Sequence, residues 1–222
     1  MLEDYLPLLL RELELTARLI KEAGLSLISI YIGGGTPTTL SAEQMDCLLR
    51  EIVKDFDLSA CEEFTVEAGR PDTITREKLD VLAKNGVDRI SINPQTLNDH
   101  VLSIIGRRHT AADFMAAWQL SEEFSFDRNV DLIAGLPEDT LESFQNTLEQ
   151  ILVLRPENIT VHTLTVKHAS TLKEEGPQRR TAMEMVEYSR HALEAAGYLP
   201  YYLYRQKGTV EALENVGYTL PD

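Results

Sequence analysis

The segment 33–37 reads Gly-Gly-Gly-Thr-Pro and directly follows Leu27–Ile32, an apolar run with the composition of a buried strand. Three glycines in a row leave the loop without Cβ atoms, so a ligand could approach the backbone and bind N–H and C=O groups directly. A tight turn that needs a positive φ would favour glycine equally, and the loop alone fits both interpretations. It is not a Walker-type phosphate loop, because no Gly-Lys-Ser/Thr follows.

Polar residues also occur at the ends of the next two apolar runs and inside the third. Glu67 could receive an ammonium or hydroxyl group of a ligand, or it could pair with Arg70 or cap the helix that follows. Gln95 comes just after Pro94, which ends the run, and it offers both a donor and an acceptor. Asp131 lies inside a β-rich run, where a buried carboxylate is costly without a partner. We expect Asp131 to have a definite partner, either neighbouring backbone or a ligand.

Two further positions are candidates with weaker signals. Arg107 lies beside Arg108 in a basic turn, and one arginine could clasp a carboxylate through its planar fork, although a solvated turn would look the same. On the last predicted long strand, 158–166, Thr165 lies on one face and His162 on the other. His162 could line a barrel or lie under a helix, and the pattern does not decide between them.

The elements that must position these residues alternate between β-type runs and amphipathic helices. Ser41 and Gln44 form a capping-box pattern at the start of one helix. Strands that are each followed by a helix imply right-handed crossovers and a mainly parallel sheet. The predicted strands are 27–32, 63–67, 88–93, 129–134 and 158–166, with a short one at 201–204; the predicted helices are 1–23, 42–53, 75–84, 98–105, 111–123, 141–154 and 180–196.

This order favours an α/β fold of the incomplete (β/α) barrel type over a doubly wound sheet. In such barrels functional groups gather at the carboxyl ends of the strands, where the polar residues above are placed. The chain begins with a helix, so we expect the first barrel strand to be missing from it. Residues 1–196 are predicted to form a partial barrel core, and residues 197–222 the start of a region after the barrel.

Composition narrows the class of protein. The chain has 222 residues, 43% of them hydrophobic, which suffices for a proper core. Its formal net charge of −15 argues against nucleic acid as a partner. No run is long enough to span a membrane, and acidic residues stand where a secretory signal would be basic, so we expect a cytoplasmic protein. The two cysteines, Cys47 and Cys61, show no metal-binding spacing, and no metal ligand is predicted.

Five segments together resemble the oxygen-independent coproporphyrinogen III oxidase family of radical S-adenosylmethionine enzymes. They are Tyr31–Thr38, Gly86–Asp99, Ile105–Thr110, Asp131–Glu142 and Glu214–Tyr218. The resemblance covers nearly the whole chain in the right order and spacing. Asn93-Pro94-Gln95 departs from the commoner Gly-Val-Gln of the family and looks like a variant group of coproporphyrinogen dehydrogenases. This departure puts the substrate in doubt more than the cofactor.

The resemblance implies S-adenosylmethionine bound beside a [4Fe-4S] cluster and an electron donor that reduces the cluster. Reductive cleavage would give a 5′-deoxyadenosyl radical that takes hydrogen from a propionate of a tetrapyrrole substrate. Loss of carbon dioxide and one electron would leave a vinyl group, converting coproporphyrinogen III to protoporphyrinogen IX.

The resemblance also implies a set of cofactor contacts, while it leaves the catalytic residues unknown. Arg107 would suit a carboxylate, and Gln95 and Asp131 would suit hydroxyl or adenine groups. The glycine-rich loop would contact the amino-acid end of the cofactor. The implied contacts are Gly34, Gly35, Thr36, Glu67, Gln95, Arg107, Asp131 and, less securely, Thr165.

The family holds its cluster with a Cys-x-x-x-Cys-x-x-Cys loop, which this chain lacks. We therefore expect a central piece of a longer protein, inactive by itself, whose cluster ligands lie elsewhere; a naturally cysteine-free relative is the other interpretation. Without a preceding strand, Leu27–Ile32 should have an open edge, which makes self-association possible. Two other functions stay open: a haem-binding chaperone of the same family, and a metabolic (β/α) barrel whose glycine-rich loop cradles a phosphate.

Overall fold

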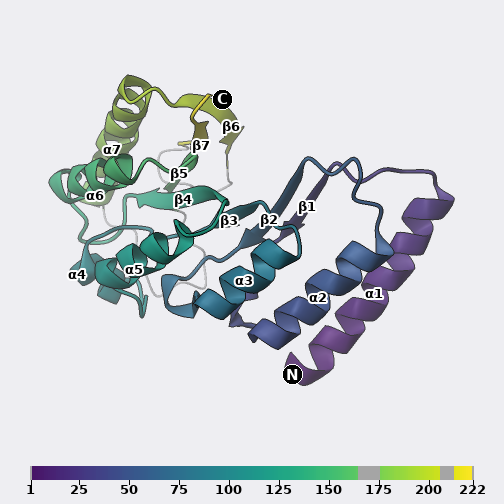
Figure 1. Ribbon diagram of the computed structural model, residues 1–222. Coiled ribbons are helices and arrows are strands. Elements are labelled where there is room, and N and C mark those ends of the chain that lie inside the picture. The colour runs from purple at the N-terminus through teal and green to yellow at the C-terminus, as the bar shows by residue number, and fades with distance from the viewer. Residues whose placement is uncertain (1, 165–175, 206–212, 222) are drawn as a thin grey trace. The chain divides into compact units, whose positions relative to one another are not determined.

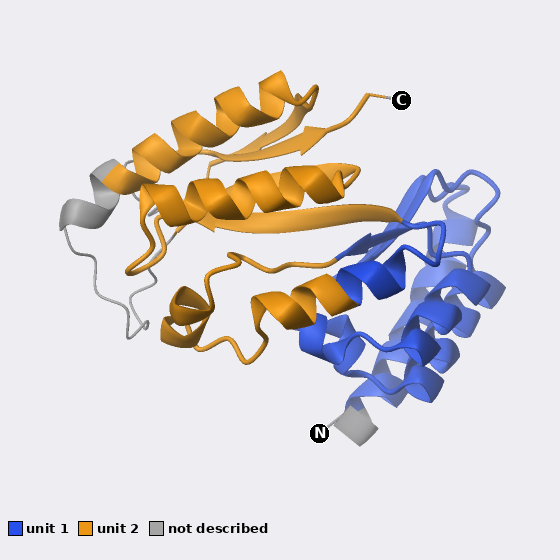
Figure 2. Ribbon diagram, turned by 60° about the vertical axis from the view of Figure 1, so that its left-hand side comes forward, with its two compact units in different colours: residues 1–91, 117–126 blue, residues 92–116, 127–222 orange. Residues whose placement is uncertain are grey.

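The computed structural model describes residues 2–164, 176–205 and 213–221 (Figure 1). The chain divides into two compact units (Figure 2). The first contains Met1–Ser91 and Ala117–Phe126, and the second contains Ile92–Ala116 and Asp127–Asp222. The sequence suggests a boundary near residue 196, between a barrel core and the region after it. This division does not correspond to the two compact units, and it stays a prediction.

The first unit is a parallel sheet of three strands with helices between them. The strands follow the order β1-β2-β3, and each neighbouring pair is parallel. Figure 1 shows α1, α2 and α3 side by side along this sheet. The elements are α1 (Leu2–Glu22), β1 (Ser29–Ile32), α2 (Ala42–Asp55), β2 (Glu63–Glu67), α3 (Arg76–Lys84) and β3 (Arg89–Ser91).

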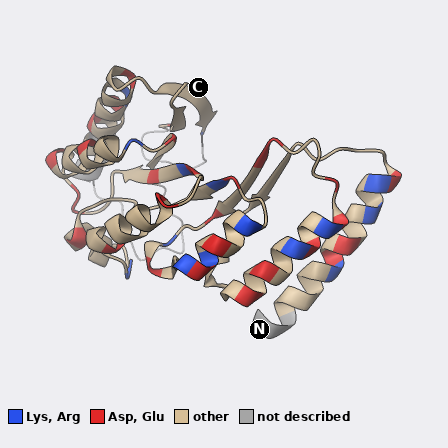
Figure 3. Ribbon diagram, in the orientation of Figure 1, with Lys and Arg blue, Asp and Glu red and all other residues tan. Residues whose placement is uncertain are grey.

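Local signals fix where these helices begin. The Ser41 side chain accepts from the Gln44 backbone, and the Gln44 side chain accepts from the Ser41 backbone, so the predicted capping box is confirmed. Thr75 caps α3 in the same way by accepting from the Lys78 amide. Acidic and basic residues both occur along the helices of this unit (Figure 3), as expected for helices with one face in solvent.

The strand β1 lies at the edge of the first unit's sheet. It pairs with β2 and with no other strand that the structure describes. It is shorter than the predicted strand 27–32, since it begins at Ser29 and does not include Leu27 and Ile28. Ile28 is 62% exposed and Tyr31 is 61% exposed, so apolar surface lies along an unpaired edge. The open edge is confirmed, and self-association stays a prediction.

The second unit contains a four-stranded mixed sheet in the order β4-β5-β7-β6. β4 and β5 are parallel, whereas β7 is antiparallel to both of its neighbours. The helix α5 (Ala111–Ser121) crosses the boundary between the units. The other elements are α4 (Asp99–Ile104), β4 (Asp127–Ala134), α6 (Leu141–Leu154), β5 (Asn158–Thr163), α7 (Gly176–Ala195), β6 (Leu199–Tyr204) and β7 (Asn215–Thr219).

Helices α6 and α7 pack against each other and lie over the same face of this sheet (Figure 2). Phe144 and Leu148 of α6 and Leu193 of α7 are buried there. Tyr198, also buried, donates to the Pro156 carbonyl at 2.7 Å, and burial raises the pKa of Tyr198 to about 12. The apolar faces of these helices therefore cover one face of the sheet.

The strand β7 was not predicted. Its sequence, Asn-Val-Gly-Tyr-Thr, contains asparagine and glycine, two residue types with low strand propensity. Pairing on both sides stabilises it in spite of this composition. The predicted class, α/β with mainly parallel strands, is confirmed. Within the described ranges, no helix combines the length and the apolarity needed to cross a bilayer.

Candidate functional site

The three glycines after β1 have three different surroundings. A Cβ atom on Gly33 would lie 2.3 Å from Cε1 of Tyr31, so the ring excludes any larger residue unless it moves. Gly34 has a φ of +108°, which other residues rarely adopt. Gly35 is outside the left-handed region, and no atom of a described residue lies within 4 Å of its Cβ position. The fold therefore needs the first two glycines, whereas the third keeps open space beside the backbone.

Side-chain hydrogen bonds tie this loop to the loop after β2. The Thr38 hydroxyl lies 2.6 Å from the Thr73 hydroxyl and 3.1 Å from the Ala68 carbonyl, to which it donates. Lys78 of α3 donates to the carbonyls of Thr38 at 2.5 Å and Thr73 at 3.0 Å. Burial lowers the pKa of Lys78 from its ordinary value. Sequence reasoning missed Lys78, because its partners are set by the tertiary fold and no spacing marks them.

The carboxylate of Glu67, at the end of β2, lies beside the glycine-rich loop. The Tyr31 hydroxyl donates to Glu67 Oε1 at 2.6 Å, and Oε2 lies 3.1 Å from the Cβ position of Gly33. Neither structural role considered for Glu67 is found. Arg70 pairs with Asp72 instead, and Thr75 caps α3. Glu67 is thus a half-buried carboxylate held by a tyrosine at a strand end.

A cavity of about 260 Å³ opens next to the loop within the first unit. Tyr5 and Leu9 of α1 and Leu48 of α2 form apolar walls, and Gly35 and Thr36 supply backbone on another side. Whole small-molecule sites usually measure about 300–1,000 Å³, so this cavity suits one part of a ligand. Apolar walls combined with exposed peptide groups suit a small group that is both aliphatic and polar.

In the second unit, the carboxylate of Asp131 has definite partners, as expected, but they are the side chains of Asn93 and Asn129 and not neighbouring backbone. Asn93 donates to Asp131 Oδ2 at 2.8 Å, and the Asp131 amide donates back to Asn93 Oδ1 at 3.2 Å. Asn129 donates to Asp131 Oδ1 at 2.8 Å. The side chain of Asp131 remains 19% exposed, and His162 Nε2 lies 3.6 Å from its Oδ2. Asn93, noted above as a departure from the family pattern, is therefore one of the two residues that orient Asp131.

Gln95 joins the same part of the second unit through its backbone. Its amide donates to the Asp131 carbonyl at 3.1 Å, and its carbonyl accepts from Ile133 at 3.0 Å. Its φ is +68°, an unusual value for a residue other than glycine. Its side chain forms no hydrogen bond with another residue that the structure describes, which leaves the amide for a ligand. Strained backbone of this kind is concentrated at functional sites.

Arg107 follows α4 in the second unit. Gly106, with a φ of +72°, ends the helix, and the Arg107 amide closes the turn by donating to the Leu102 carbonyl at 2.9 Å. Arg107 is half-buried, whereas Arg108 is exposed. His109 is buried and its Nε2 lies 3.2 Å from the Pro94 carbonyl, which supports a structural role. Thr165 lies outside the described residues.

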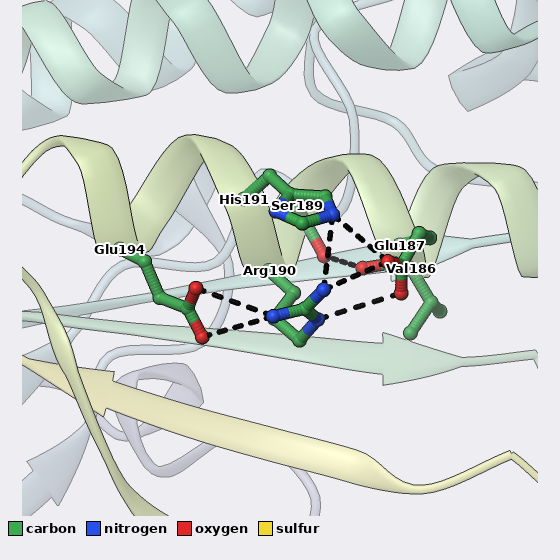
Figure 4. Close-up of polar contacts among 6 residues, drawn as sticks. All are labelled: Val186, Glu187, Ser189, Arg190, His191 and Glu194. Carbon is green, nitrogen blue, oxygen red and sulfur yellow. Dashed lines mark hydrogen bonds and ion pairs between the residues drawn. The ribbon is translucent and has the colours of Figure 1, made fainter.

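The polar cluster on α7 is not a site. Arg190 pairs with Glu187 at 2.8 Å and with Glu194 at 3.2 Å, and His191 contacts Glu187 at 2.9 Å (Figure 4). The hydrogen bond from Arg190 is the main reason why the pKa of Glu187 is lowered. All these side chains are exposed and lie three or four residues apart on one helix, where such pairs contribute little.

The cysteines do not suit an iron–sulfur cluster. Cys47 is exposed on α2, and Cys61 is half-buried before β2. Among the described residues no three His, Cys, Asp or Glu side chains are grouped as metal ligands. Two thiolates on separate elements cannot replace the three that such clusters take from closely spaced cysteines.

Comparisons with known proteins agree with the geometry. Residues 3–151 match the radical SAM superfamily. The chain is 44% identical over 217 residues to the oxygen-independent coproporphyrinogen-III oxidase-like protein HemZ of Bacillus subtilis, covering 95% of this chain and 43% of that protein. It is 34% identical to the heme chaperone HemW of the same organism, covering 97% of this chain and 59% of HemW.

A solved structure extends the agreement to the fold. Coproporphyrinogen III oxidase HemN from Escherichia coli, described as a radical SAM enzyme, superimposes with a TM-score of 0.78 at 25% identity. The match covers 99% of this chain and 49% of HemN, so the chain spans about half the length of its relatives. The expected barrel type is thereby confirmed. The chain belongs to the radical SAM superfamily, and it is similar to HemN, HemW and HemZ proteins.

Proposed function

We propose that this chain binds S-adenosylmethionine and that the whole protein uses it in the metabolism of a tetrapyrrole. The observation that carries this proposal is Gly35, whose open Cβ position lies in a loop flanked by the oriented carboxylate of Glu67. The amino-acid end of the cofactor carries an ammonium and a carboxylate. An anionic side chain and free peptide N–H groups are their natural partners.

The proposed contacts are of two kinds, the backbone groups of a loop and polar side chains. Glu67, fixed by Tyr31, accepts from the cofactor's ammonium, and the loop at Gly34–Thr36 binds through its backbone. Gln95 and Asp131 bind hydroxyl or adenine groups, and Arg107 binds a carboxylate through its fork. Thr165 is proposed by resemblance alone. When bound beside a reduced cluster, S-adenosylmethionine supplies one-electron chemistry; the cluster's ligands would come from outside this chain.

The proposed reaction is oxidative decarboxylation of coproporphyrinogen III to protoporphyrinogen IX, with an electron donor as partner. The similarity to HemZ and HemN supports it. Binding and transfer of haem is the second candidate, supported by the similarity to HemW over 97% of the chain. Anaerobic incubation of the whole, cluster-loaded protein with coproporphyrinogen III separates the two. Decarboxylated product supports the oxidase, whereas haem transfer to an apoprotein without decarboxylation supports the chaperone.

Cofactor binding can be tested separately by calorimetric titration of S-adenosylmethionine into the chain. Arg107→Lys keeps the charge but loses the planar fork, so affinity should fall by roughly one order of magnitude or more. Arg108→Lys is the matched control, because Arg108 is exposed in the same turn. Equal behaviour of the two variants would remove Arg107 from the site. Absence of binding by the unaltered chain would contradict the proposed function as a whole.

A further inference from the structure

One face of the second unit's sheet carries a group of polar side chains at the β4–β5 pair. Asn129 and Asp131 on β4 and Thr160 and His162 on β5 share this face, because side chains alternate along a strand. Contacts across the two strands confirm the arrangement: Thr160 lies 3.3 Å from Asn129, and His162 lies 3.6 Å from Asp131. The residues between them face the other way and are buried; they are Val130, Leu132, Ile159 and Val161.

The carboxylate of Asp131 is fixed in direction by two amides. Each of its oxygens accepts one amide hydrogen, from Asn93 and Asn129, both at 2.8 Å. The amides are themselves held, since Asn93 Oδ1 accepts from the Asp131 backbone and Asn129 Oδ1 accepts from the Thr160 hydroxyl. An ionised carboxylate has about four acceptor positions, so this network orients Asp131 without saturating it. Orienting an acceptor in advance lowers the cost of binding a donor.

His162 stands at a distance from Asp131 that a hydrogen bond does not span. Its Nε2 lies 3.6 Å from Asp131 Oδ2, and its side chain is 36% exposed. A direct hydrogen bond would require about 2.7–3.2 Å. One hydroxyl oxygen can lie at ordinary hydrogen-bond length from both atoms, donating its hydrogen to the carboxylate and accepting the Nε2 hydrogen of the ring. A hydroxyl has the donor and acceptor that this gap requires.

We propose that His162 is a ligand-binding residue that, together with Asp131, holds one ribose hydroxyl of the bound nucleoside. The inference rests on the proposed function for the identity of the ligand. It assigns a contact to His162, and it assigns to Asn93 and Asn129 the positioning of Asp131. A ligand that lacks this hydroxyl leaves the carboxylate and the ring without their common partner, which makes the pair a determinant of specificity.

The test compares S-adenosylmethionine with its 2′-deoxy and 3′-deoxy analogues by calorimetric titration into the chain. His162→Phe keeps a planar ring in the strand but removes both nitrogens, and it should weaken S-adenosylmethionine binding about tenfold, the usual effect of one hydrogen bond. For one of the two analogues, His162→Phe and the unaltered chain should bind equally, because that analogue lacks the hydroxyl in question. Asp131→Asn should likewise weaken the binding of S-adenosylmethionine but leave the binding of that analogue unchanged.

Two further variants separate binding from folding. His191→Phe makes the same exchange on the exposed face of α7 and should leave the affinity for all three ligands unchanged (Figure 4). His162→Gln keeps an N–H donor and should recover part of the affinity that His162→Phe loses. The inference is overturned if His162→Phe binds S-adenosylmethionine as tightly as the unaltered chain, or if it weakens all three ligands equally. Failure of the unaltered chain to bind any of them would instead overturn the proposed function.

Discussion

Two glycines that follow parallel strands, Gly35 after β1 and Gly135 after β4, have opposite surroundings. Among the residues that the structure describes, none has an atom within 4 Å of the Cβ position of Gly35, and the backbone conformation of Gly35 is open to other residue types. Gly135 has a φ of +83°, and its Cβ position lies 2.8 Å from the Cβ of Ala182 in α7. The same residue type therefore leaves space for a ligand in one loop and lets a helix approach the sheet in the other. Four predictions test this contrast.

The largest effect is expected for Gly135→Ala. Overpacking against Ala182 and an unfavourable φ together should reduce the free energy of unfolding by about 2–4 kcal/mol. Urea unfolding followed by circular dichroism measures the loss. Ala182→Gly provides the internal check, because it removes the overlapping methyl group and should return part of the stability in the double variant. A change below about 0.5 kcal/mol would mean that α7 is not tightly packed at this point.

Gly35→Ala should show the reverse behaviour. The new methyl group meets open space, so the free energy of unfolding should change by less than about 0.5 kcal/mol. Affinity for S-adenosylmethionine should fall about tenfold or more, because the methyl group occupies the space proposed for the cofactor. Titration and thermal unfolding of one preparation test both statements. Normal affinity would show that the space beside Gly35 is not used, and a large loss of stability would show that the glycine is structural.

Lys78→Met should loosen the loop that follows Gly35. The variant keeps most of the aliphatic stem but loses the hydrogen bonds to the carbonyls of Thr38 and Thr73. Lys78 is half-buried, so the remaining solvent screening limits the expected loss in the free energy of unfolding to about 1 kcal/mol. Hydrogen exchange of the amides between residues 33 and 40 should become faster. Lys84→Met, on the exposed end of α3, is the control, and equal exchange in both variants would contradict the anchoring role.

The smallest effect concerns Asp139, in the loop that follows Gly135. The residue is buried, and neither carboxylate oxygen has a hydrogen-bond partner among the described residues. Burial raises the pKa of Asp139 above its ordinary value, because the charged carboxylate loses contact with water. A carboxyl whose pKa is higher when folded than when unfolded destabilises the fold at neutral pH. This penalty disappears as the pH falls through the folded pKa towards the unfolded value.

Asp139→Asn should therefore stabilise the chain at pH 7 by roughly 0.5 kcal/mol, and the gain over the unaltered chain should shrink at acid pH. Chemical unfolding of both proteins at pH 7 and pH 4.5 gives the two differences. Glu138→Gln, which changes an exposed carboxylate paired with His100 at 2.8 Å, serves as control. A gain that is independent of pH would show that the charge of Asp139 is not its cause.

The sequence by itself determined the order and type of most elements. The capping box at Ser41 depends on contacts between residues close in the chain. The strands that contain Glu67 and Asp131 are marked by local runs of β-type residues. The candidate site positions could also be predicted from the sequence, because the carboxyl ends of parallel strands lie at the same edge of a sheet. The family resemblance came from five segments, among them Tyr31–Thr38 and Asp131–Glu142.

Only the tertiary structure decided which distant residues contact and orient the residues at those positions. Lys78 reaches Thr38 across 40 residues, Asn93 orients Asp131 across 38, and β7 exists because it pairs with β5. The difference between Gly35 and Gly135 also depends on distant residues. Gly135 is crowded by Ala182, 47 positions along the chain, whereas no described residue lies close to the Cβ position of Gly35. Local propensity acts over a few residues, whereas these contacts arise only when the sheet brings distant segments together.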